Sequence, residues 1–171
     1  MLTESQIIVT AQEIACRVQS GGIVWCCGNG GSAAQADHFA AELVGRLHRN
    51  RPPIAAVSLC GQGGAVPTCI ANDFGFDEIF SRQLEALAKP GDVLIAISTS
   101  GSSENVLRAI QSARAKGAHV VGLCGASGMH VRCDELISVS CLATWDVQDE
   151  HSAICHRLAH YIERFVFHDR N

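Results

Sequence analysis

The feature that most constrains the fold is a regular alternation between short apolar runs and stretches with helical periodicity. Residues 23–27 form an apolar run bounded by glycines on both sides, which is typical of a strand buried in a parallel sheet. Similar runs predict strands at residues 54–59, 93–98 and 120–124, and a weaker one predicts a strand at 135–139. Strands that alternate with helices form parallel sheets covered on both faces. The sequence therefore predicts a doubly wound α/β fold with a mostly five-stranded parallel sheet.

The stretches between the strands place apolar side chains three and four residues apart. This period predicts a first helix at residues 2–18, which a glycine pair ends. After a glycine turn at residues 28–31, Ser32 is placed to cap the next helix, which runs to Gly45. Further helices are predicted at residues 78–88, 104–116 and 150–167, and a loose loop is predicted at residues 61–64.

Length and charge narrow the class of protein. At 171 residues the chain matches one domain, spanning residues 1–171, which buries about 70% of the surface exposed on unfolding. The net charge of −4 and the lack of a Lys/Arg run argue against nucleic-acid binding. The apolar runs are far shorter than the ~20 residues that span a bilayer, and residues 1–14 lack the pattern of a secretory signal. We therefore expect a cytoplasmic protein without a membrane span.

The nine cysteines include no CxxC pair and lie mostly in apolar stretches. A zinc ribbon or a disulfide framework needs paired spacings, which this chain lacks. The pattern therefore predicts reduced cysteines that pack in the core.

The first loop after a strand, residues 28–33, matches the dinucleotide fingerprint G-x-G-x-x-[GA]. That fingerprint also expects an acidic residue near the end of the second strand, where Val57, Ser58, Leu59 and Cys60 stand instead. A P-loop is disfavoured as well, because no Gly-Lys-Ser/Thr follows the glycines. The loop thus gives little support for a nicotinamide or P-loop nucleotide site.

A second loop, residues 98–103, places five hydroxyl side chains and a glycine between a strand and a helix. Helix N-terminal amides carry partial positive charge, and hydroxyl groups add neutral hydrogen bonds, so the loop resembles a phosphate cradle. A polar turn in which Ser103 merely caps the helix explains the same residues. From the residues alone, both interpretations stay open.

Two groups of side chains have the chemistry of a metal or acid-base site. His38 and Glu42 lie at i and i+4 on one helix face, where they could bind one ion or form an ordinary surface pair. The last helix carries Gln148, His151, His156 and His160. Acid-base chemistry near neutral pH needs only one of these histidines, so the others are expected to be structural or exposed to solvent.

Several motifs together make the sequence similar, nearly end to end, to the sugar isomerase (SIS) domain family, and within it to the phosphoheptose isomerases. They are CGNGGS at 27–32, HFAAELVGR at 38–46, NRP at 50–52, NDFGF at 72–76, FSR at 80–82, ISTSG at 97–101, and Gln148 with His156. The resemblance implies a flavodoxin-like SIS fold. It also implies a homotetramer with sites at subunit interfaces and a small-molecule sugar phosphate as substrate.

The resemblance also assigns site residues. It implies that the substrate phosphate binds to Ser98, Thr99, Ser100 and Ser103, and that the sugar lies near Asn29, Gly30, Ser32, Asn72, Asp73 and Gln148. It implies one zinc ion per subunit, held by His38, Glu42, Gln148 and His156. Arg46 and Arg82 match family positions near the site or the subunit contacts, where we expect a supporting role.

The activity implied is the conversion of sedoheptulose 7-phosphate to D-glycero-D-manno-heptose 7-phosphate through an enediol. In this scheme Glu42 is the base and His156 the acid, while zinc polarises the carbonyl. One departure concerns substrate preference: residues 144–147 replace a polar stretch that ends in arginine in the family. The alternative function is a non-catalytic SIS protein that binds a phosphosugar or a replication initiator.

Overall fold

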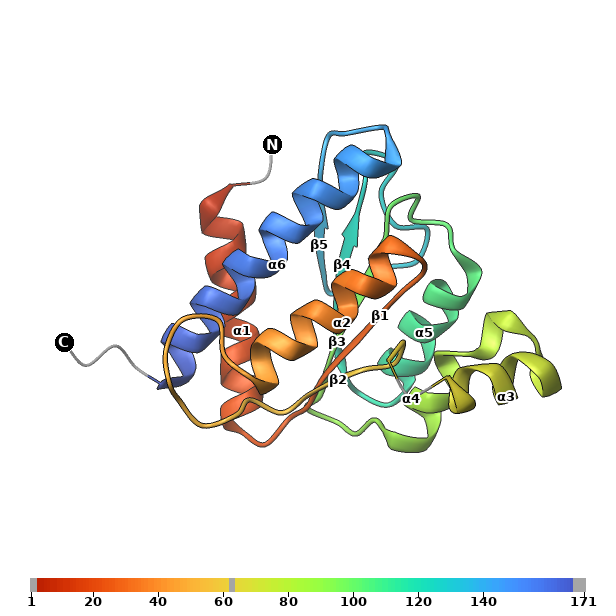
Figure 1. The fold of residues 1–171 in the computed structure, drawn as a ribbon, viewed down its shortest axis with the longest axis horizontal. Coiled ribbons are helices and arrows are strands. Elements are labelled where there is room, and N and C mark those ends of the chain that lie inside the picture. The colour runs from red at the N-terminus through yellow and green to blue at the C-terminus, as the bar shows by residue number, and fades with distance from the viewer. Residues whose placement is uncertain (1–2, 62–63, 168–171) are drawn as a thin grey trace.

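In the computed structural model the chain forms a five-stranded parallel sheet covered by helices (Figure 1). The structure describes residues 3–61 and 64–167. The strands are β1 (Val24–Gly28), β2 (Ala56–Ser58), β3 (Val93–Ser98), β4 (His119–Cys124) and β5 (Glu135–Ser138). The helices are α1 (Glu4–Gln19), α2 (Gly31–Val44), α3 (Ala65–Phe74), the short 3₁₀ helix η1 (Phe76–Glu78), α4 (Ser81–Leu87), α5 (Glu104–Ala115) and α6 (Thr144–Phe167).

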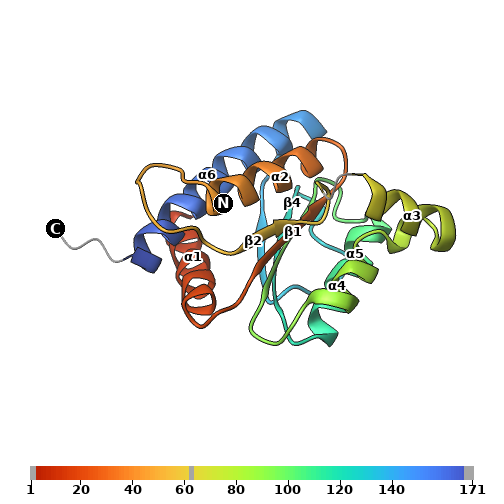
Figure 2. The same ribbon diagram turned by 60° about the horizontal axis from the view of Figure 1, so that its bottom comes forward.

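The helices divide between the two faces of the sheet (Figures 1 and 2). Helices α1, α2 and α6 cover one face, where Ile14, Phe39 and Leu158 are fully buried in one apolar cluster. Helices α4 and α5 cover the other face, where Leu84 and Ile110 belong to a second cluster. The predicted doubly wound arrangement is therefore confirmed. Within the described ranges, no helix is long and apolar enough to cross a membrane.

The order of the strands brings two loops together at the carboxyl ends of β1 and β3. The order is β2-β1-β3-β4-β5, so the chain leaves β1 for one side and returns to its other side through β3. Gly28, at the end of β1, lies opposite Ile97 in β3. Ligands of open α/β sheets bind outside the carboxyl ends of the strands where the strand order reverses. The loops after β1 and β3 meet at this point.

Some predicted boundaries were wrong. Helix α2 begins at Gly31 after Gly30, whose φ of 55° and ψ of −120° suit glycine, so Ser32 lies inside the helix and does not cap it. Helix α6 begins six residues before the predicted residue 150, helix α4 is shorter than predicted, and α3 was not predicted. Strand β2 has three residues, fewer than predicted. Residue 2 of the predicted first helix and residues 62–63 of the predicted loop lie outside the described residues.

Four of the nine cysteines lie in the core, as the apolar pattern predicted, but the prediction was wrong for Cys16 and Cys69, which are exposed. Cys26, Cys27 and Cys124 are fully buried in the sheet, and Cys155 of α6 is 2% exposed. Burial raises the pKa of the Cys155 thiol to about 12 and raises the pKa of Cys26 and Cys27 well above the ordinary value. These thiols stay protonated at neutral pH and act as small apolar side chains.

Candidate functional site

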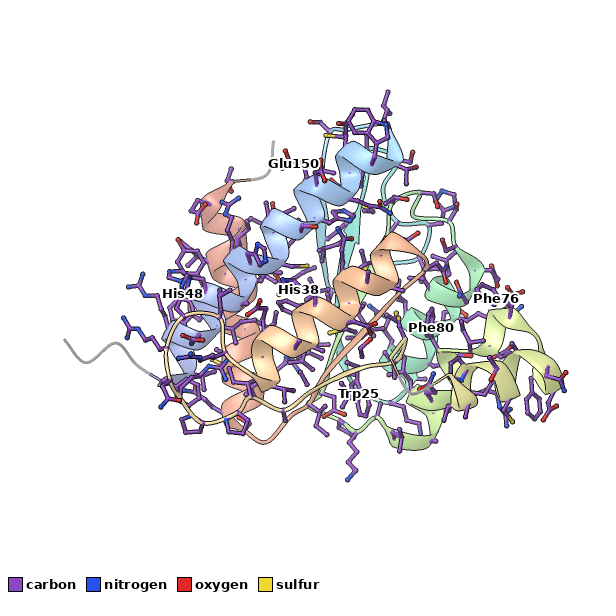
Figure 3. The ribbon with its side chains drawn as sticks, viewed as in Figure 1. Trp25, His38, His48, Phe76, Phe80 and Glu150 are labelled. Atoms are coloured by element: carbon purple, nitrogen blue, oxygen red, sulfur yellow. The ribbon has the colours of Figure 1, made fainter. Side chains whose placement is uncertain are left out.

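The side chains of His38, Glu42 and His156 meet between α2 and α6. His38 Nε2 lies 2.8 Å from His156 Nε2 and 3.3 Å from Glu42 Oε1. One ligand atom from each residue lies within 4.8 Å of the others. Figure 3 shows His38 on the part of α2 that runs beside α6. The structure therefore brings together three of the four predicted metal ligands from two helices that are distant in sequence.

The cluster of these three residues has the chemistry of a metal site that is open on one side. The His38 side chain is 49% exposed and that of Glu42 is 17% exposed. Two imidazole nitrogens and a carboxylate oxygen suit zinc, and catalytic zinc sites keep a position for water or substrate. The residues present thus fit the implied metal.

Gln148, the fourth predicted ligand, lies two turns before His156 on α6, against the glycine turn. A Cβ atom added at Gly31 would lie 2.4 Å from Gln148 Nε2. The Gln148 backbone carbonyl accepts a hydrogen bond from the Gln35 side chain of α2. The segment 144–147, which departs from the family pattern, forms the first turn of α6, where Val147 is buried and Trp145 is 68% exposed.

A buried ion pair links α2 and α6 beyond the cluster. Arg51 Nε lies 2.9 Å from Glu163 Oε2, and the two side chains are 4% and 5% exposed. The Arg51 guanidinium also donates to the carbonyl oxygens of Glu42 and Leu43, both at 2.8 Å, at the end of α2. Arg51 therefore holds the backbone of a cluster residue. In the sequence, Arg51 stands out only as part of the NRP motif, which indicates no role for it.

The charge of Glu163 is stabilised within this contact. Burial by itself raises the pKa of the Glu163 carboxyl, but hydrogen bonds from Arg51 and from the backbone N–H groups of Arg49 and Leu47 outweigh that effect. The net result is a pKa below the ordinary value for glutamate. At neutral pH the carboxylate is thus ionised and paired.

The glycine turn after β1 carries the predicted sugar-binding residues. Its backbone is closed by a hydrogen bond from Ser32 N to Asn29 O of 2.9 Å. Gly30 is exposed at the tip, while Ser32 is 3% exposed. The Asn29 amide pairs with the amide of Asn105 in the first turn of α5. Sequence reasoning missed Asn105, because no local pattern shows which residue faces Asn29.

The loop after β3 has a fixed internal shape. Ser98 is 3% exposed, its hydroxyl accepts a hydrogen bond from Gly101 N at 3.1 Å, and it lies 3.1 Å from the Ser103 hydroxyl. Ser103 occupies the N-cap position of α5, but its side chain makes no capping hydrogen bond. Ser100 is exposed, and Thr99 is half-buried. The polar-turn interpretation, in which Ser103 acts as the cap, is therefore wrong in that detail.

Asn72 and Asp73 lie apart from the cluster, on α3. Their side chains are exposed and bond to each other, with Asn72 Nδ2 donating to Asp73 Oδ1 at 2.7 Å. Figure 1 shows α3 at the end of the molecule away from α1 and α6. Arg82 lies with its guanidinium carbon 3.6 Å from the centre of the Phe74 ring. Within this subunit, the structure does not bring these predicted substrate residues to His38.

The remaining histidines of α6 have different surroundings. His151 is fully buried, and burial lowers its pKa, so it is neutral at physiological pH. His160 meets the ring of His48 edge-on, with centroids 5.3 Å apart. His48 and His160 line a hollow of about 370 Å³, which is also lined by His156, Arg157 and Tyr161. The hollow therefore shares one residue, His156, with the cluster.

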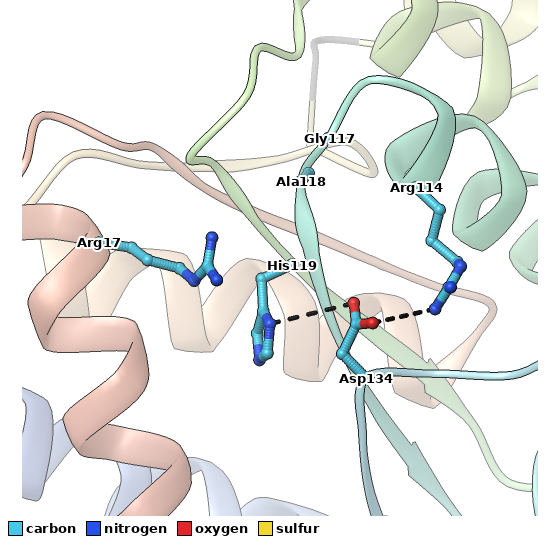
Figure 4. Close-up of a pocket in the computed structure, with 6 residues that line it drawn as sticks. All are labelled: Arg17, Arg114, Gly117, Ala118, His119 and Asp134. Atoms are coloured by element: carbon cyan, nitrogen blue, oxygen red, sulfur yellow. Dashed lines mark hydrogen bonds and ion pairs between the residues drawn. The ribbon is translucent and has the colours of Figure 1, made fainter.

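Another hollow, of about 240 Å³, lies at the start of β4, beside residues 117–119 (Figure 4). It is lined by Arg17, Arg114 and His119, and both arginines lie close to carboxylates. Arg114 lies 3.0 Å from Asp134, and Arg17 lies 2.7 Å from Glu13. These contacts neutralise the cations within the hollow, at the edge of the sheet where the strands begin.

Comparison with known proteins links this geometry to a family. A family model described as SIS domain matches residues 2–125. The phosphoheptose isomerase of Rhodospirillum rubrum is 46% identical over 164 residues, which cover 95% of this chain and 84% of the relative. The probable phosphoheptose isomerase of Thermoplasma acidophilum is 42% identical over 164 residues, which cover 95% of this chain and 90% of the relative.

Solved structures agree with the sequence comparison. A phosphoheptose isomerase from Neisseria gonorrhoeae superposes with a TM-score of 0.85 at 36% identity, covering 93% of this chain and 85% of that one. One from Francisella tularensis gives a TM-score of 0.88 at 33% identity, covering 94% and 86%. The predicted SIS fold is thereby confirmed. By its sequence and its fold, the chain belongs to the SIS domain family and, within it, to the phosphoheptose isomerases.

Proposed function

We propose that the chain converts sedoheptulose 7-phosphate to D-glycero-D-manno-heptose 7-phosphate by moving a proton between C1 and C2. The observation that carries this proposal is that His38 Nε2 lies 2.8 Å from His156 Nε2 and 3.3 Å from Glu42 Oε1. The names of the relatives supply the substrate class. The reaction needs a base, an acid and a group that stabilises the enediolate oxygen, and the cluster offers all three chemistries.

The loop after β3 binds the phosphate in this proposal. Ser98, Thr99, Ser100 and Ser103 donate hydroxyl hydrogen bonds together with the N-terminal amides of α5, and Ser98 also keeps the loop in shape. Asn29, Gly30 and Ser32 contact the sugar from the glycine turn. The meeting of the loops after β1 and β3 at the strand-order reversal supports this assignment, because one sugar phosphate could contact both loops.

Glu42 takes the proton from C2 of the aldose or from C1 of the ketose, and returns it to the neighbouring carbon. His156 moves the proton between the oxygens on C1 and C2. Arg51 keeps the Glu42 backbone fixed by its hydrogen bond to the Glu42 carbonyl. The open side of the cluster, where the His38 side chain is 49% exposed, gives the substrate access to both groups.

His38, Glu42, Gln148 and His156 would hold one zinc ion per subunit. A zinc ion held there would supply Lewis-acid chemistry, which would polarise the substrate carbonyl and stabilise negative charge on its oxygen. The nitrogen and oxygen donors of His38, Glu42 and His156, which lie within 4.8 Å of one another, support this assignment.

The working form in this proposal is a cytoplasmic homotetramer in which each chain is one SIS domain and the sites lie at subunit interfaces. Support comes from α3, where Asn72 and Asp73 lie apart from the cluster of their own subunit. Near them, Phe74 is 54% exposed and Phe76 is 59% exposed. A neighbouring subunit that covers these rings would bring Asn72 and Asp73 to a second site.

The test is to incubate the purified protein with sedoheptulose 7-phosphate, with and without added zinc, and to measure aldose formation. Wild-type protein is expected to convert the sugar in a zinc-dependent way, and the Glu42→Gln variant is expected to lose at least ~100-fold in rate, in line with the effect of removing a general base. If folded protein binds the sugar phosphate without turnover, the non-catalytic SIS function replaces this one.

A further inference from the structure

The amide side chains of Asn29 and Asn105 form a reciprocal pair between two loops. Asn29 Nδ2 donates to Asn105 Oδ1, and Asn105 Nδ2 donates to Asn29 Oδ1, both at 2.8 Å. Asn29 belongs to the glycine turn after β1, and Asn105 lies in the first turn of α5, directly after the loop 98–103. The pair therefore connects the turn proposed to bind the sugar with the loop proposed to bind the phosphate.

The surroundings of Asn105 make this contact obligatory. Asn105 is 2% exposed, so its amide has almost no access to water and depends on Asn29 for its hydrogen bonds. Two parallel hydrogen bonds fix the relative orientation of the amides as well as their distance. By contrast, the bonds that Ser98 makes to Gly101 and Ser103 join residues of one loop. They shape that loop without tying it to the glycine turn.

We propose that Asn105 is a positioning residue that sets, through Asn29, the spacing between the glycine turn and the phosphate loop. This proposal rests on the proposed function, because it assumes that one sugar phosphate contacts both loops. The sugar is then held at a fixed distance from its phosphate anchor. Small misplacement of a bound reactant is costly for catalysis, so a residue that fixes this distance affects turnover without touching the substrate.

If Asn105 sets this spacing, its substitution should weaken the binding of one ligand and not of another. A residue that only supports the fold would not have this selective effect. Inorganic phosphate contacts only the loop after β3, so its binding does not depend on the spacing between the loops. A sugar phosphate contacts both loops, so its binding does. Heptitol 7-phosphate, the reduced and unreactive form of the substrate, allows binding to be measured without turnover. The ratio of the two affinities therefore reports the spacing.

The experiment is calorimetric titration of the full chain with each ligand, for wild-type protein and the Asn105→Ala variant. We expect Asn105→Ala to weaken heptitol 7-phosphate binding about tenfold, equivalent to ~1.4 kcal/mol, and to leave phosphate binding unchanged. The matched control is Gln83→Ala, which removes another buried amide that donates to the carbonyls of Leu59 and Ile79. Gln83→Ala is expected to lower the unfolding temperature while leaving both affinities unchanged.

A double-mutant cycle tests whether the two amides act as one unit. The Asn29→Ala, Asn105→Ala double variant is expected to bind heptitol 7-phosphate no more weakly than Asn29→Ala alone. Additive losses, or equal weakening of both ligands in Asn105→Ala, would overturn the role of Asn105. A wild-type protein that binds phosphate but not heptitol 7-phosphate would overturn the proposed function as well, which distinguishes the two failures.

Discussion

His38 Nε2, on α2, lies 2.8 Å from His156 Nε2, on α6, although 118 positions separate the two residues in the sequence. Two imidazole nitrogens this close cannot both carry a proton directed at the other, so at least one offers a lone pair. Glu42 Oε1 lies 3.3 Å from the same His38 nitrogen. The arrangement therefore favours a shared proton or a shared metal ion.

Zinc binding is the first expected consequence of this cluster. Wild-type protein should bind one zinc ion per chain, and His156→Ala should weaken the affinity by at least ~100-fold, because even changes around the ligands cost about 10–100-fold. Competition with a chromophoric chelator measures this. The control is His48→Ala, because His48 contacts His160 outside the cluster. Equal zinc affinity in both variants would contradict the assignment.

The pair of Arg51 and Glu163 should make the free energy of unfolding depend on acid pH. The pKa of Glu163 is lowered in the folded state, so its charge stabilises the fold above the ordinary carboxyl pKa of about 4.3. This stabilisation is lost as the pH falls through the lowered pKa. We expect denaturant midpoints of the wild-type protein to decrease below about pH 5.

The Glu163→Gln variant isolates this contribution, because it keeps the shape of the side chain and removes the charge. At pH 7 it should be less stable than wild type by ~3–5 kcal/mol, the usual cost of breaking one side of a buried pair. At pH 3 the difference should be smaller. A constant difference at both pH values would mean that the charge of Glu163 does not contribute in this way.

Substitution of Gly31 should disturb the site more than the fold. A Cβ atom at this position would lie 2.4 Å from Gln148 Nε2, which is the far end of a flexible side chain. Gly31→Ala is therefore expected to displace Gln148, to weaken zinc binding and to lower the isomerase rate, with a loss of stability of less than ~1 kcal/mol.

The control for Gly31 is Gly21→Ala, at the opposite edge of the sheet. Gly21 has a φ of 92° and no atom within 4 Å of an added Cβ, so alanine there strains only the backbone. It should cost about 1–3 kcal/mol of stability and leave the rate unchanged. If Gly31→Ala keeps the full rate while Gly21→Ala loses activity, Gln148 is not part of the site.

Strong local patterns predicted most of the fold. Strand β3 has the predicted bounds, because all of Val93–Ser98 is apolar or small and buried on both faces. Helix α3 was missed although Val66, Ile70 and Phe74 recur every four residues, because Pro67 and the glycines just before the helix are typical of a loop. The first turn of α6 was missed because polar or exposed residues such as Trp145 carry no helical period.

The site was predictable only where residues close in sequence share a face. His38 and Glu42 lie one helical turn apart, so their proximity followed from the helix itself. The contacts of Arg51 with Glu163 and of Asn105 with Asn29 join residues 112 and 76 positions apart, and no local pattern encodes such pairs. The resemblance to the family named His156 as a further ligand, but the packing of α6 on α2 is what brings it to His38.

The central claim is that Glu42 moves a proton between C1 and C2 of a heptose 7-phosphate, and isomerisation in deuterium oxide tests it most directly. The His38 and Glu42 side chains are 49% and 17% exposed, so a proton held by the Glu42 carboxylate should exchange with solvent during turnover. We predict that wild-type protein places deuterium at C2 of the aldose, and that Glu42→Gln neither isomerises nor exchanges. Undiminished isomerisation or undiminished exchange in Glu42→Gln would contradict the claim.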